Sequence, residues 1–77
     1  MTWARSPGKD QGFIAIGHNA NTFTVDTVHD KTFFHGYHYG KGGMLLGASE
    51  LFGGHGAAAK ARAWCEVRNQ RVQETSK

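Results

Sequence analysis

The five histidines of this 77-residue chain have the most versatile chemistry in the sequence, because histidine can ligate a metal ion or transfer a proton. His35 and His38 are three residues apart, a spacing that would bring them together on a helix. The residues around them instead predict a strand, on which positions three apart point to opposite faces. Because the chain also has a single cysteine, we expect neither a metal site nor a cofactor.

The nucleophilic and acidic residues do not follow a spacing typical of catalysis. Cys65 lies on the apolar face of a predicted helix, where a thiol is usually an inert small group. Ser49 precedes His55, but no G-x-S-x-G sequence surrounds it. The carboxylates are scattered, and a chain of this length has little room for a pocket of ~300 Å³ beside its core. We therefore expect a non-enzymatic protein.

A glycine-rich segment precedes the predicted helix and has two interpretations. Glycines at a helix N-terminus let several backbone N–H groups point at one anion, and Lys60 would lie nearby. The segment also lacks the G-x-x-x-x-G-K-[ST] spacing of a phosphate-binding loop, which favours a simple connector. The candidate anion site comprises Gly53, Gly54 and Gly56.

The predicted strand 32–39 is rich in rings and would carry Phe33, His35, Tyr37 and Tyr39 on one face. If the helix covers the other face, this one is exposed. Exposed rings suit a protein interface, or base stacking by a single-stranded nucleic acid, although the strand lacks the K/R-G-F/Y start of an RNA-recognition motif. The net charge is only +3, which favours the protein interface.

The helix that would cover the sheet begins after the glycine-rich segment. Five of the seven residues from 57 to 63 are alanine, the residue with the highest helix propensity. Their spacing places Ala57, Ala61, Trp64 and Cys65 on one face. We expect the helix to continue to about Arg71 and then fray.

The rest of the chain predicts strands separated by short turns, and consecutive strands joined in this way pair antiparallel. The expected fold is α+β, a three- to four-stranded antiparallel meander followed by one C-terminal helix packed on one face. This single domain would span residues 12–72, between an irregular arm at 1–11 and a disordered tail at 73–77. The predicted strands are 12–18, 22–28, 32–39 and 44–48.

The sequence lacks the features of an exported or membrane-spanning chain. The N-terminal residues contain no apolar run typical of a signal peptide, and no stretch approaches the ~20 apolar residues of a membrane span. A single cysteine fits a reducing compartment. We therefore expect the protein in the cytoplasm.

The helix start, residues 54–61, reads Gly-His-Gly-Ala-Ala-Ala-Lys-Ala and resembles the G-A-A-A-K-A helix start found among small anti-CRISPR proteins of the type I class. The resemblance implies a phage-encoded inhibitor, acting in the host cytoplasm, that docks on a CRISPR surveillance complex. A DNA mimic of this kind should be strongly acidic, whereas this chain has a charge of +3. The resemblance thus implies binding to a protein surface, or direct contact with nucleic acid.

The leading hypothesis is a small non-enzymatic binding protein that docks on a protein partner, as a phage-type inhibitor of a host defence complex. The alternative is a small basic nucleic-acid-binding domain that uses the aromatic sheet face and the helix arginines. A homodimer through the aromatic face, cross-linked by Cys65 if that thiol is exposed, remains open as well. The candidate contact residues are Tyr37, Tyr39, Lys41, Lys60, Arg62, Arg68 and Arg71.

Overall fold

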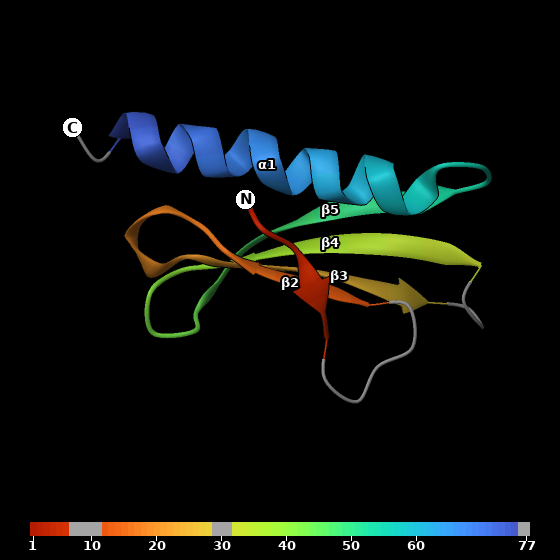
Figure 1. Cartoon of the computed structure of the whole chain (residues 1–77), viewed down its shortest axis with the longest axis horizontal. Helices are drawn as coiled ribbons and strands as arrows, with labels where there is room; N and C mark the ends of the chain where they lie inside the picture. Colours follow the sequence, from red (N-terminus) through yellow and green to blue (C-terminus); the bar gives the residue numbers. More distant parts are fainter. Residues whose placement is uncertain (7–11, 29–31, 76–77) are drawn as a thin grey trace.

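The computed structural model, which describes residues 1–6, 12–28 and 32–75, is an antiparallel sheet with one helix across a single face (Figure 1). The strand order follows the sequence and all neighbouring strands are antiparallel. The α+β meander with a C-terminal helix is therefore confirmed. Its elements are β1 (Ala4–Arg5), β2 (Phe13–Ile16), a 3₁₀ turn (His18–Ala20), β3 (Thr22–Val28), β4 (Phe33–Tyr39), β5 (Leu45–Gly53) and α1 (Ala57–Thr75).

The register of the sheet decides which side chains meet the helix, because residues directly opposite each other point to the same side. Ala15, Phe23 and His38 form one cross-strand row, and all three are buried on the helix side. The alternate residues form the other face, which we call the open face. Its members are Ala4, Ile14, Ile16, Thr22, Thr24, Asp26, Val28, Phe33, His35, Tyr37, Tyr39, Leu45, Ala48, Leu51 and Gly53.

Small residues bring α1 close to the sheet. Ala57, Ala61 and Cys65 are buried one helical turn apart, as their spacing predicted. Below them lies Gly36, where an added Cβ would be 3.2 Å from the Cys65 Sγ and 3.3 Å from the Ala61 carbonyl oxygen. The helix packs at this distance because the sheet has no side chain at residue 36.

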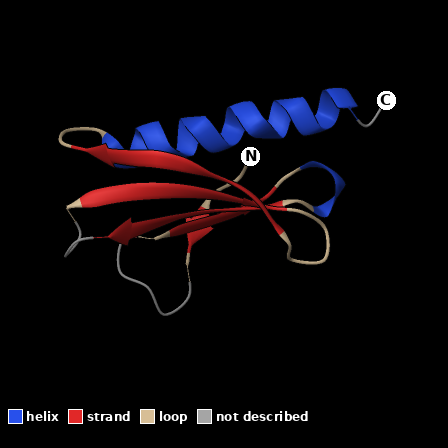
Figure 2. Cartoon of the chain, turned by 180° about the vertical axis from the view of Figure 1, so that it is seen from behind, coloured by secondary structure: helices blue, strands red, loops and turns tan. Residues whose placement is uncertain are grey.

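The core is small and lies between α1 and the middle of the sheet. Phe23 and Val25 are fully buried against Ala61 and Cys65. Trp3 and Trp64 pack at its margin, and the N-terminal ammonium lies 3.7 Å from a carboxylate oxygen of Glu66 on α1. The figures accordingly show the N-terminus between the helix and the sheet (Figures 1 and 2).

The prediction of an irregular N-terminal arm was wrong in part. The arm contains β1, so the sheet has five strands rather than the expected three or four. Ala4 and Arg5 pair with β2 as a short edge strand, where Arg5 lies over the Phe13 ring with its Cζ 5.1 Å from the ring centroid. A two-residue strand leaves no periodic pattern in the sequence. Residues 7–11 of the arm lie outside the described part.

The second correction concerns β5, which is longer than the predicted strand 44–48 and extends to Gly53. Two register shifts interrupt its pairing with β4. At one of them the Ser49 hydroxyl accepts a hydrogen bond from the Gly36 backbone N–H at 2.8 Å. Because such irregularities break the alternation of side chains, the residues after 48 looked like a loop.

The third correction concerns the C-terminus, where the helix continues to Thr75 instead of fraying after Arg71. Two features support this extension. Val72 lies on the inner side of α1 and is half-buried, and glutamine and glutamate, which are frequent in this segment, have high helix propensity. The predicted tail therefore begins with helical residues, while residues 76–77 and the predicted turn at 29–31 lie outside the described part. Among the described residues, no helix is long and apolar enough to cross a membrane.

Candidate functional site

Three aromatic rings form a row along β4 on the open face. The ring centroids of His35 and Tyr37 lie 4.5 Å apart, and those of Tyr37 and Tyr39 lie 6.3 Å apart. The rings are tilted against one another, a geometry typical of favourable aromatic pairs. The sequence predicted that these residues share a face but not which face the helix covers, and the position of α1 on the other side leaves the row uncovered by the helix.

Exposed aliphatic side chains border the row on β5, and a further one, Ile16, lies on β2 beyond Thr22. Ile16 is 68% exposed, Leu45 51% and Leu51 44%. Leu45 lies opposite Tyr39, and Leu51 lies opposite His35. Monomeric proteins rarely leave a large contiguous apolar patch in water unless it is an interaction surface. The open face therefore has the composition of an interface.

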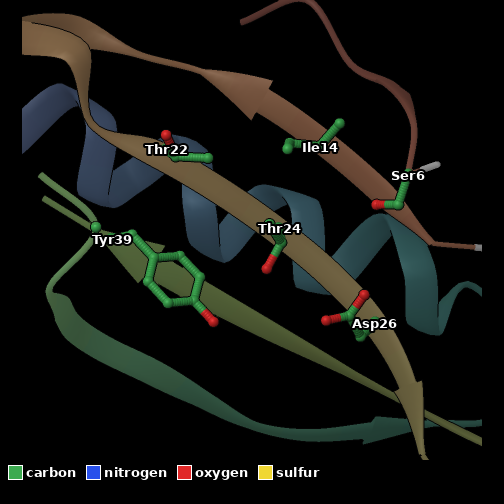
Figure 3. Close-up of a pocket in the computed structure, with 7 residues that line it drawn as sticks. Ser6, Ile14, Thr22, Thr24, Asp26 and Tyr39 are labelled. Atoms are coloured by element: carbon green, nitrogen blue, oxygen red, sulfur yellow. The ribbon is translucent and has the colours of Figure 1, made fainter. Parts of the chain in front are cut away.

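A hollow of about 420 Å³ lies on the same face beside the aromatic row (Figure 3). Thr24 lies between Tyr39 and Asp26, and Ile14 and Ser6 border the hollow on another side. The loop between β4 and β5 bends away from α1 and contributes Gly43 (Figure 1). We expected little room for a pocket of ~300 Å³ beside the core. This hollow is larger and lies over the strands of the open face, with Ser6 and Gly43 at its margins.

Most of the surface that the described residues give to the hollow is apolar, and its oxygen atoms belong to hydroxyl and carboxylate side chains. The hydroxyls of Ser6, Thr22, Thr24 and Tyr39 both donate and accept hydrogen bonds, and Asp26 supplies a carboxylate. Thr24 Oγ1 is buried and has no hydrogen-bond partner among the described residues. Buried polar atoms are normally paired, so an unpaired oxygen beneath a hollow suits a site that receives a polar ligand.

The predicted cationic contacts on α1 do not join this site. Arg62 is on α1 and lies over Phe13, with its Cζ 4.7 Å from the ring centroid on the helix side of the sheet. Lys60 and Arg71 are exposed on α1, and Lys41 is exposed in the turn after β4. The structure thus separates the tyrosines from the helix cations by the thickness of the sheet.

Arg68 is a structural residue rather than a free contact. Its Nε donates a hydrogen bond to Nδ1 of His38 at 3.1 Å, and its Cζ lies 5.0 Å from the centre of the Trp64 ring. Because Nδ1 accepts, the proton of a neutral His38 is on Nε2, which lies 2.6 Å from the Asn21 Oδ1. Burial, and next the Arg68 guanidinium, lower the pKa of His38.

The Cys65 thiol is not available for catalysis or for cross-linking a dimer. It is fully buried between α1 and the sheet, with Sγ 3.9 Å from the backbone oxygen of Thr24. Burial raises its pKa to about 12, so the thiol is protonated at neutral pH. The thiol of this chain therefore acts as a small core side chain.

The glycine-rich segment has the geometry of a tight connector. Gly53 ends β5, and Gly54 and Gly56 have φ values of 79° and 75°, which side-chain-bearing residues rarely adopt. The Ala57 N–H donates to the Gly54 carbonyl at 3.3 Å, which uses one of the amide groups that an anion would need. Over the described residues, no three His, Cys, Asp or Glu side chains group to hold a metal ion.

The sequence analysis did not predict the hollow, although the pattern of β3 indicates which of its side chains share the open face. In β3 the polar residues Thr22, Thr24 and Asp26 alternate with Phe23 and Val25, a pattern typical of a half-buried strand. The structure buries Phe23 and Val25 and has the polar residues on the open face. The contributions of Ser6 and Gly43 come from loops, whose paths carry no periodic signal.

Comparison with known proteins identifies no relative of this chain. No protein-family model matches the sequence, and no curated protein or solved structure shows significant similarity to it.

Proposed function

We propose that this chain is a small non-enzymatic binding protein whose open face docks on a protein partner. The observation that carries the proposal is the aromatic row of β4, continued by exposed leucines, on the sheet face opposite α1. Aromatic side chains dominate the energetics of protein interfaces because they bury a large area at a small cost in conformational entropy.

The distribution of charge favours a protein partner over nucleic acid. A single strand that stacks on Tyr37 and Tyr39 would need cations beside those rings to contact its phosphates. Arg62 and Arg68 instead contact Phe13 and Trp64 on the other side of the sheet. The lining of the hollow contributes an acidic group, Asp26, which would repel phosphate.

The specific form of the proposal is a phage-type inhibitor that docks on a CRISPR surveillance complex. Its support is the resemblance of residues 54–61 to an anti-CRISPR helix start. With a net charge of +3, such an inhibitor would bind a protein surface rather than act as a DNA mimic. The test is co-expression of the tagged protein with a type I surveillance complex, followed by affinity purification. We expect the complex to copurify with the wild-type protein.

A matched pair of variants locates the contact. Leu51→Ser and Val67→Ser remove aliphatic side chains of similar exposure, 44% and 50%, from the open face and from α1. We expect Leu51→Ser alone to lower retention of the partner, and its combination with Tyr37→Ala to lower it at least about tenfold, because each change removes apolar contact area. Val67→Ser should retain it at the wild-type level. Equal retention by all variants, or loss with Val67→Ser alone, would exclude the open face.

The same purification from a bacterial lysate, without the surveillance complex, distinguishes the general proposal of a binding protein from the specific proposal of an inhibitor. A different protein that is captured by the wild type and by Val67→Ser, and lost from the open-face variant, would keep the binding function. It would at the same time refute the inhibitor form if the surveillance complex failed to copurify in the first experiment.

A further inference from the structure

We infer that the hollow of the open face receives an arginine side chain of the partner. The inference rests on the proposed function, because the partner is taken to approach the open face. The inference adds the type of partner side chain that would enter the hollow, which the aromatic row does not specify. The hollow, about 420 Å³ in volume, is large enough for one such side chain.

The charges around the hollow suit a cation. Among the described residues that line it, Asp26 alone is charged, within a chain of net charge +3. Three arginines instead lie over aromatic rings on the helix side: Arg5 and Arg62 over Phe13, and Arg68 over Trp64. A carboxylate has about four lone-pair sites, so contacts of Asp26 within the chain leave it acceptor capacity for a guanidinium.

The shape and remaining polar groups favour arginine in particular. A guanidinium presents five donors in a plane and stacks on aromatic rings. The Tyr39 ring lies on one side of Thr24 and the Asp26 carboxylate on the other (Figure 3). The hydroxyl oxygens can accept from the outer donors, and Ile14 offers an apolar surface to the methylene stem. Thr24 Oγ1, unpaired in the described part of the chain, gains a donor in this arrangement.

The test is an NMR titration of the whole chain with Nα-acetyl-arginine methylamide. The control ligand is the citrulline analogue, a neutral molecule of nearly the same shape. We expect the arginine probe to shift the amide signals of residues 22–26, and to bind at least about tenfold more tightly than the citrulline probe. In Asp26→Asn this preference should disappear, whereas Glu66→Gln on α1 should keep it.

Equal affinity for the two probes, or no shift at residues 22–26 with either, would overturn the inference. A preference for arginine that persists in Asp26→Asn would overturn it too. These outcomes are distinguishable from failure of the proposed function, because the partner-retention assay with Tyr37→Ala and Leu51→Ser does not depend on the hollow. The assay can succeed while the arginine preference is absent.

Discussion

Phe23→Ala is expected to lower the free energy of unfolding by about 3–5 kcal/mol, a large part of the stability of a domain of this size. The Phe23 ring is fully buried and stacks on the His38 ring, with centroids 4.4 Å apart. It belongs to a core cluster of four buried residues, so few neighbours can move to fill the space. The measurement is urea unfolding followed by tryptophan fluorescence.

The matched control is Tyr37→Ala, which removes a ring of similar size from the open face of the next strand. Tyr37 lies opposite Thr24 and is not part of the core. We expect a loss of about 1 kcal/mol or less, the usual size of a cross-strand pair contribution. A loss as large as that of Phe23→Ala would contradict the division into a helix-side core and an open face.

Acidification below neutral pH is expected to lower stability through His38. Its folded-state pKa lies below the ordinary value, so the unfolded chain takes up a proton at higher pH than the folded one. This contribution is complete above the usual histidine range, near 6.5, and is lost as the pH falls below it. Protonation would also place an N–H on Nδ1, facing the donor of Arg68. The measurement is the free energy of unfolding at pH 7.5 and pH 5.

Arg68→Met tests the same network at constant pH. It removes the hydrogen bonds to His38 and to the Leu46 carbonyl, and should lower stability by about 1–3 kcal/mol at pH 7.5. Because one cause of the lowered pKa is removed, its loss of stability between pH 7.5 and pH 5 should be smaller than in the wild type. The same acid sensitivity in His38→Gln as in the wild type would show that His38 is not the titrating group.

The sequence was sufficient for the layer arrangement because its periodic patterns are local. The alternation in β3 and the spacing of Ala57, Ala61 and Cys65 each placed the correct side chains on the buried face. The sequence also placed Tyr37 and Tyr39 on one face, and the helix covers the other. These inferences need only the geometry of a single strand or helix.

The parts that could not be predicted depend on contacts between distant residues. Arg68 broke the apolar stripe of the helix and was interpreted as a surface contact, but it reaches His38, thirty residues earlier in the sequence. The hollow combines Ser6, Thr24 and Gly43 from three separate segments. The extension of β5 contains a register shift at which the Ser49 hydroxyl accepts a hydrogen bond from the Gly36 N–H, thirteen residues earlier in the sequence.

Hydroxyl-radical footprinting of the complex with the copurified partner tests the central claim most directly. The two tyrosines of the chain, Tyr37 and Tyr39, both lie on the open face, so their oxidation reports on that face alone. We expect both tyrosines and Leu51 to be protected in the complex, while Val67 on α1 is oxidised at the rate of the free protein. Tyrosines oxidised at the free rate together with a protected Val67 would contradict docking through the open face.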